Sequence, residues 1–355
     1  MSPVPDSRLT RLLGIAHPLL LAPMAGAADE ALAIAVARAG GLGALPCAML
    51  DADTLRAQVA RFRAAVQAPL NLNFFCHAEP AADPARQARW RERLAPYYDA
   101  LGVPRNTQAD GAQRRPFDAA ACALVEALRP EVVSFHFGLP APALLGRVKA
   151  GGARVLGSAT TVDEARWLAA HGCDAIIAQG WEAGGHRGAF LDTETATQPG
   201  LFALLPQVVD AVDRPVIAAG GIGDARGIRA ALALGAAGVQ LGTAFLLSDE
   251  ARIRPLHRAA LQSPRTARTA VTNLFSGRPA RGIVNRLMEE LGPMADDVPA
   301  FPTAGAALAP LRQRTEPEGI DDFVNLWAGE AAPLARTGSA EAIARGLIEA
   351  ALSPP

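Results

Sequence analysis

One histidine of the sequence lies in a segment that is unusually rich in glycine. Residues 179–188 have the sequence QGWEAGGHRG, in which glycines stand on both sides of His186. A sharp turn needs only one or two glycines, so this segment indicates a backbone that another group approaches closely. A neutral imidazole, with an ordinary pKa of about 6.5, can accept a proton from a carbon next to an electron-withdrawing group. We therefore expect His186 to be a catalytic base.

Two further glycine segments, AAGGIGD (218–224) and QLGTAF (240–245), suggest a phosphate site. Gly220, Gly221 and Gly223 leave backbone N–H groups free to face an anion, and a helix beginning near Asp224 adds its positive end. The alternative is that both segments are merely tight turns. No GxGxxG motif opens a helix after a first strand and no GxxxxGK[ST] motif is present, so a dinucleotide site and a P-loop are both unsupported.

The sequence around the remaining histidines gives weaker indications of a catalytic or metal-binding role. His77 and His136 each follow an apolar run and could line the same pocket as His186. His136, in SFHFG, is better interpreted as a hydrogen-bonded histidine of the fold. A metal site made of the three histidines would lack a carboxylate, and we expect none. A Ser-His-Asp triad is unsupported because there is no G-x-S-x-G motif.

Short apolar runs that alternate with Ala-rich amphipathic stretches must position these groups. Helices are expected at 29–41, with Asp29 as N-cap, and at 52–66. Apolar runs without alternation are typical of parallel strands covered on both faces. The pattern predicts an α/β fold, a (β/α)8 TIM barrel. The predicted strands are 18–26, 42–46, 69–75, 131–138, 153–159, 175–180, 215–221 and 238–245.

Two blocks interrupt this rhythm, the polar and Pro-rich residues 76–116 and the non-repeating residues 250–325. We expect both to be insertions that join into a second, mostly helical substrate or lid domain over the barrel mouth. The barrel would then comprise residues 1–75, 117–249 and 326–355, with 339–352 as its last helix.

The barrel hypothesis assigns places to the motifs. In this fold the active site lies at the carboxyl ends of the strands, and phosphates bind after strands seven and eight, where both glycine loops fall. Flavin mononucleotide (FMN) suits such a mouth. Asn71 and Gln179, polar residues at predicted strand ends, could hydrogen-bond the isoalloxazine edge. The alternative is that each amide satisfies only loop backbone.

Composition excludes several classes of protein. A balance of 34 basic against 35 acidic residues, with a net charge of −1 and 5% aromatic residues, argues against nucleic-acid binding. Four scattered cysteines without metal spacing favour reduced thiols in the cytoplasm. The N-terminus has no signal-peptide pattern. Residues 230–248 are uncharged, but their glycines favour a buried barrel segment over a membrane span.

Taken together, the motifs resemble those of the nitronate monooxygenase family. LAPMAG, LNLNFF, VVSFHFGLP, AQGWEAGGHRG, VIAAGGIGDARG and GVQLGTAF occur in the family's order over about residues 20–250, and FSGRPARGIVNR extends the match to 275–286. The resemblance implies an FMN-containing TIM barrel that uses O2 to oxidise alkyl nitronates, such as propionate 3-nitronate, to a carbonyl compound and nitrite. The SFHFGLP and GRPARG segments resemble the bacterial class I members, which do not use nicotinamide.

The resemblance also implies site residues. His186 corresponds to the catalytic base, and Met24 would lie beneath the flavin ring. Flavin contacts would fall on Asn71, Gln179, Gly184, Gly221, Gln240, Leu241, Gly242 and Thr243. No role follows for Trp181, Glu182 or Arg187.

Three alternatives remain open from the sequence. A flavin-dependent enoyl-[acyl carrier protein] reductase and an NAD(P)H:quinone reductase would share this scaffold, and the SFHFGLP segment favours the monooxygenase over both. A non-enzymatic flavin-binding protein would keep the phosphate loops but would not need His186.

Overall fold

Eight parallel strands form the central sheet of the structure, a computed structural model that describes residues 6–107, 114–192 and 194–352. The order is β1-β9-β8-β6-β5-β4-β3-β2, and a bridge between Leu20 and Leu42 brings the two edges together into a barrel. Each strand falls within a predicted one, so the predicted TIM barrel is confirmed. The strands are β1 (Leu19–Leu21), β2 (Gly43–Pro46), β3 (Leu70–Phe75), β4 (Val132–His136), β5 (Arg154–Ala159), β6 (Ala175–Gln179), β8 (Val216–Ala219) and β9 (Gly238–Leu241).

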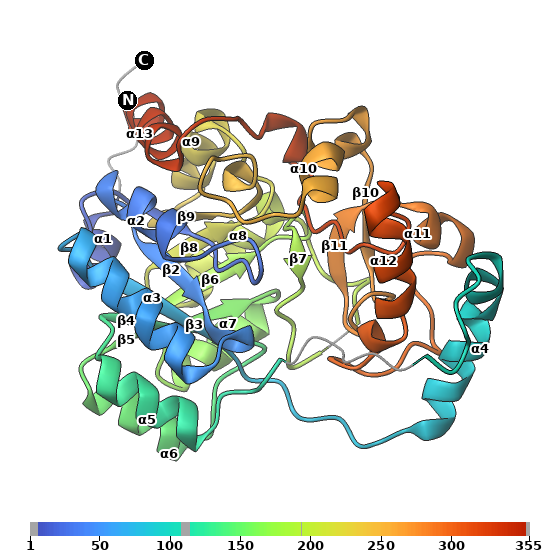
Figure 1. Ribbon diagram of the computed structural model, residues 1–355. Helices are drawn as coiled ribbons and strands as arrows, with labels where there is room; N and C mark the ends of the chain where they lie inside the picture. The colour runs from blue at the N-terminus through green and yellow to red at the C-terminus, as the bar shows by residue number, and fades with distance from the viewer. Residues whose placement is uncertain (1–5, 108–113, 193, 353–355) are drawn as a thin grey trace.

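Helices surround the barrel in the left part of Figure 1. Their starts follow from capping side chains, since the carboxylate of Asp29 accepts from the N–H of Ala31, and Asp224 caps α9 in the same way. The predicted helices at 29–41, 52–66 and 339–352 are therefore present. The barrel helices are α2 (Glu30–Arg38), α3 (Ala52–Ala65), α5 (Ala119–Leu128), α6 (Pro142–Ala150), α7 (Val162–Ala170), α8 (Leu201–Ala211), α9 (Ala225–Ala233) and α13 (Ala340–Leu352).

Two apolar clusters stabilise the barrel. The larger one packs the outward faces of the strands against the helices. The second takes residues from most strands, among them Leu156 and Ile217, and adds Leu9 and Leu13 of α1 (Ser7–Leu13). Side chains from so many strands of a barrel can meet only in its interior. Helix α1 therefore closes the end of the barrel at which the strands begin. The opposite, carboxyl end is left for chemistry.

The smaller part, on the right of Figure 1, has its own buried cluster. In it α4 (Pro84–Ala100) packs on residues 274–311, where the indole N–H of Trp90 donates to the carbonyl of Ala304 (3.3 Å) and the hydroxyl of Tyr98 to that of Ala307 (2.6 Å). The two interrupting blocks therefore meet, although residues 108–113 lie outside the described residues. Its other helices are α10 (Pro255–Leu261), α11 (Arg286–Leu291) and α12 (Ala309–Thr315). The chain also has the 3-10 helices η1 (Cys47–Met49), η2 (Thr243–Phe245), η3 (Pro264–Ala267), η4 (Ala304–Ala306), η5 (Glu316–Glu318) and η6 (Ala332–Leu334).

A three-stranded antiparallel sheet, which the sequence analysis did not predict, joins the two parts. Its order is β10-β11-β7, with β10 (Thr269–Thr272), β11 (Ala280–Ile283) and β7 (Gly185–His186). Ala280 pairs with His186 and Arg281 with Gly185. The expected base therefore lies on a strand of the smaller sheet, above the barrel.

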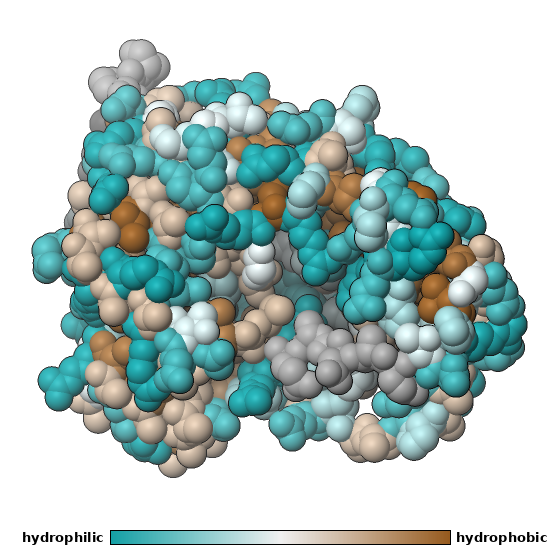
Figure 2. Space-filling model, viewed as in Figure 1, coloured by the Kyte–Doolittle hydropathy of each residue, from teal (hydrophilic) through white to brown (hydrophobic). Residues whose placement is uncertain are grey.

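The uncharged residues 230–248 are divided between α9, β9 and η2, as expected for a buried barrel segment. Among the described residues, no helix has both the length and the apolar character that a membrane crossing requires. The face shown in Figure 2 is mostly hydrophilic, with hydrophobic residues scattered in small groups.

Candidate active site

A serine from the smaller part hydrogen-bonds the imidazole of His186. Its Nε2 lies 2.9 Å from Oγ of Ser276, and that hydroxyl donates its proton to the carbonyl of Arg278 (3.2 Å). In the arrangement in which the hydroxyl proton goes to that carbonyl, Nε2 donates to Ser276, and Nδ1, which has no hydrogen-bond partner among the described residues, is the nitrogen that can accept a proton.

Aromatic rings surround this imidazole. The ring centroid of His186 lies 5.2 Å from Phe301, 5.6 Å from Trp327, 6.1 Å from Phe137 and 6.4 Å from Phe75. Burial among these rings lowers the pKa of His186 well below its usual range, and the nearby charge of Arg114 lowers it further. The imidazole is therefore neutral near pH 7, as a proton acceptor must be.

This lowered pKa predicts the acid side of the pH profile. A base must be unprotonated to act, so activity is lost only as the pH falls through its pKa. We expect kcat/KM for a neutral nitroalkane to stay level down to about pH 6.5, the ordinary histidine value, and to fall only below it. A steady-state profile between about pH 5 and 7 measures this, and an acid limb centred above about pH 6.5 would contradict it.

Side chains of the barrel fix the backbone of residues 179–188, the histidine loop. Gln179, at the end of β6, donates from Nε2 to the carbonyl of His186 (3.0 Å) and accepts from the N–H of Gly188 (2.8 Å). The same His186 carbonyl accepts from Nε2 of His136 (3.2 Å), which confirms His136 as a hydrogen-bonded histidine of the fold. Arg187 is 1% exposed and donates to the carbonyl of Gln179 (3.0 Å) and the side chain of Gln198 (2.8 Å). These hydrogen bonds hold the loop on both sides of its base.

A buried carboxylate holds the segment that follows. Glu164, in the first turn of α7, is fully buried and accepts from the N–H and hydroxyl of Thr160 (2.6 and 2.8 Å). Its other oxygen accepts from the N–H groups of Phe190 (2.5 Å) and Leu191 (3.2 Å). Glu164 thus connects the histidine loop to the end of β5.

Removal of this carboxylate is expected to destabilise the protein. Glu164→Ala would leave buried donors without acceptors, so we expect the free energy of unfolding to fall by about 3 kcal/mol. Glu164→Gln keeps one oxygen and should lose less. Thermal denaturation followed by circular dichroism measures both variants. Equal midpoints for the wild type and Glu164→Ala would show that the carboxylate does not hold this segment.

Gly184 allows two backbones to cross. A Cβ at Gly184 would lie 2.5 Å from the nitrogen of Gly329 and 2.7 Å from the carbonyl carbon of Ala328. Gly185 has a φ of +72° and open space where a Cβ would stand. The hydroxyl of Thr243 accepts from the N–H of Gly329 (3.0 Å) and fixes the crossing segment to the end of β9. Gly184 is therefore required by packing against residues 328–329.

The mouth of the barrel offers unpartnered polar groups. Within the part of the chain that is described, the buried atoms Oδ1 of Asn71 and Oε1 of Gln240 have no hydrogen-bond partner. The same part supplies no acceptor for the backbone N–H groups of Gly221, Gly242 and Thr243, which follow β8 and β9. Gly221 has a φ of +69°, which favours glycine. Amide oxygens that need donors, together with N–H groups after β8 and β9 that need acceptors, fit a ligand with both a heterocyclic N–H edge and a phosphate.

Similarity to known proteins identifies the family to which this chain belongs. The nitronate monooxygenase family model matches residues 6–350. The chain is 41% identical over 344 residues to a nitronate monooxygenase of Pseudomonas aeruginosa, an alignment that covers 96% of this chain and 98% of the relative. The chain belongs to the nitronate monooxygenase family. It is thus an oxidoreductase, as the sequence resemblance predicted.

Other relatives agree with this membership. A nitronate monooxygenase of Paraburkholderia phytofirmans is 42% identical over 93% of this chain and 90% of its own length. The crystal structure of nitroalkane oxidase from Streptomyces ansochromogenes superposes with a TM-score of 0.87 at 38% identity and covers 97% of both chains. FabK from Thermotoga maritima aligns less well, with a TM-score of 0.72 at 27% identity over 98% of this chain and 96% of its own.

The predicted site residues of this family member lie in different surroundings. Asn71 is the second residue of β3, deeper than the expected strand end, and its Nδ2 donates to Oγ of Ser134 (2.9 Å). Leu241 is buried in the outer cluster, so only its backbone faces the mouth. Met24 lies beside Gly242, with its sulfur 3.4 Å from the place of a Cβ there.

Residues without a predicted role support the loop. The carboxylate of Glu182 accepts from the N–H of Leu201 (2.8 Å) at the start of α8. The ring of Trp181 lies between two guanidinium groups, each 5.4 Å from its centroid, which belong to Arg187 and Arg281. Ser276 was not among the predicted site residues, because nothing in its surroundings marks it as the partner of a histidine 90 positions away.

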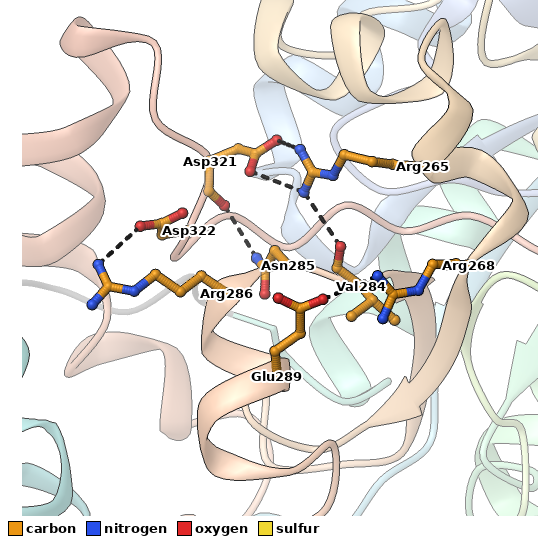
Figure 3. A pocket seen from close by; sticks show the side chains of 8 residues that line it. All are labelled: Arg265, Arg268, Val284, Asn285, Arg286, Glu289, Asp321 and Asp322. Carbon is orange, nitrogen blue, oxygen red and sulfur yellow. Dashed lines mark hydrogen bonds and ion pairs between the residues drawn. The ribbon is translucent and has the colours of Figure 1, made fainter.

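The smaller part also carries a surface pocket that none of these residues lines, shown in Figure 3. Arg265 pairs there with Asp321 (2.7 Å), Arg268 with Glu289 (3.1 Å) and Arg286 with Asp322 (3.4 Å). Since its arginines are paired with acids and it contains none of the predicted site residues, this pocket is a network of surface ion pairs.

Proposed function

We propose that this chain is an FMN-dependent enzyme that uses O2 to oxidise alkyl nitronates, including propionate 3-nitronate, to a carbonyl compound and nitrite. The observation that supports this most directly is the imidazole of His186, which hydrogen-bonds Ser276 and lies near the positive charges of Arg114 and Arg278. An anionic substrate is stabilised in such surroundings, and a neutral nitroalkane can lose its proton there.

The residues present fit the proposed cofactor. Asn71 and Gln240, whose side-chain oxygens lack partners, would hold the edge of the ring, with Gln179, Gly184 and Met24 beside it. Gly221, Gly242 and Thr243, together with the backbone of Leu241, would bind its polar groups through N–H donors. Bound FMN would supply the redox chemistry between the nitronate and O2.

The chain's own groups carry the proton chemistry. His186 accepts the proton from the carbon that bears the nitro group, while Ser276 holds its other nitrogen. The carbonyl of His186 stays fixed by Gln179 and His136, so the ring keeps its direction as it becomes charged. Phe137 and Phe301 limit the access of water to this ring.

Two measurements on the purified protein test the proposal. The visible absorption spectrum should be that of oxidised flavin, and propionate 3-nitronate should cause O2 uptake together with nitrite release. A colourless protein that cannot be reconstituted with FMN would refute it. Anaerobic mixing separates the reductase alternatives, since rapid flavin bleaching by NAD(P)H rather than by a nitronate would indicate a reductase.

A further inference from the structure

Two arginines flank His186 without an acidic partner. The guanidinium carbon of Arg278 lies 4.0 Å from the centroid of Phe137, and that of Arg114 lies 5.7 Å from the centroid of Phe301. Both rings also contact the imidazole of His186. Among the described residues neither arginine forms an ion pair, and the guanidinium of Arg114 makes no hydrogen bond.

The two most deeply buried arginines of the described residues, Arg281 and Arg187, are compensated. Arg281 is 3% exposed and pairs with Glu330 (3.0 Å), and Arg187 donates to carbonyl and amide oxygens. Removing a cation from water without a partner costs free energy, which a bound anion recovers. Burial lowers the pKa of both Arg114 and Arg278 but leaves them charged near pH 7. The mouth therefore carries two positive charges free for an anionic ligand.

The two arginines differ in position. Arg278 is close to the base, since its carbonyl accepts the proton of Ser276 and its guanidinium donates to the carbonyl of Ala189. Arg114 contacts the ring of Phe301, as His186 does, and comes from the segment after α4. A ligand whose reacting end lies at His186 and Arg278 would need a second negative group to use Arg114.

We propose that Arg114 is a specificity-determining residue that selects nitronates carrying a second negative group, while Arg278 serves the nitronate group that all substrates share. This proposal rests on the proposed function. A carboxylate on the substrate would form with Arg114 the charge-assisted hydrogen bonds that the guanidinium lacks in the chain itself.

Two substrates of equal length provide the test. Propionate 3-nitronate and propyl-1-nitronate differ only by a carboxylate in place of a methyl group. Arg114→Gln should lower kcat/KM for propionate 3-nitronate by about ten- to hundredfold, mainly through KM, and leave that for propyl-1-nitronate unchanged. Arg115→Gln, a change at the exposed neighbouring arginine, is the matched control and should alter neither.

Binding of unreactive analogues provides a second readout. Succinate and butanoate have the shapes of the two nitronates, and their dissociation constants can be measured by titration calorimetry with the FMN-loaded protein. The wild type should bind succinate more tightly, and Arg114→Gln should abolish that preference. If no nitronate is oxidised, the proposed function fails while the preference for succinate still tests Arg114. Equal losses for both ligands, no loss at all, or a reduced FMN content of Arg114→Gln would overturn the assignment.

Discussion

Replacement of His186 by asparagine should abolish most activity on neutral nitroalkanes while sparing nitronates. A neutral substrate needs a base, and general-base catalysis contributes about 10²- to 10⁴-fold, so kcat/KM for nitroethane should fall by that factor. A nitronate has already lost its proton. Its kcat/KM should fall by no more than about tenfold, the value of one neutral hydrogen bond.

Oxygen uptake with nitroethane and with its nitronate measures this difference. The wild type and His186→Asn must contain equal amounts of FMN. His171→Asn is the control, because His171 is an exposed residue at the end of α7 and should leave both activities intact. Equal losses on the nitroalkane and its nitronate would mean that His186 does not act as a base.

Substitution by alanine should destabilise the protein to different extents at the two adjacent glycines of the histidine loop. Gly184→Ala places a Cβ against the backbone of residues 328–329, which cannot move aside as a side chain can, so we expect a loss of about 3 kcal/mol in stability. The base would move as well, and a displacement of about 1 Å can cost roughly 10²-fold in rate. Gly185→Ala meets open space and should cost only the positive φ, about 1–2 kcal/mol.

Thermal denaturation and steady-state kinetics on both variants measure whether Gly184→Ala loses more stability and activity than Gly185→Ala. Gly146→Ala is a further control, since Gly146 lies inside α6 with no atom near its missing Cβ, and alanine favours a helix. A Gly185→Ala variant less stable than Gly184→Ala would show that backbone conformation, rather than the crossing, dominates this loop.

The sequence was sufficient for the barrel because its signals are local. Each strand is a short apolar run, and caps such as Asp29 and Asp224 act within a few residues of their helices. His186 was recognisable for the same reason, since the glycines that expose it stand next to it. The position of Asn71 was less accurate, because the end of β3 is set by pairing with β4 as far as Phe75.

The surroundings of the base could not be predicted because they depend on distant packing. Ser276, Arg278 and Phe301 come from a block without repeats, and only the folded chain brings them to the barrel mouth. Gly184 shows a second limit of prediction from the sequence. The sequence indicated a close approach by another group, and the structure shows that residues 328–329 of the same chain make that approach.

The strand that carries the base has a consequence for protein engineering. Because β7 pairs with β11, His186 is held by the hairpin of the smaller part as well as by Gln179 of the barrel. A chimera that exchanges only residues 250–325 with a relative would replace Ser276 and the pairing partner of β7 together. Transplantation of substrate preference between such enzymes should therefore include residues 179–191 with the exchanged block, so that the base and its support come from one parent.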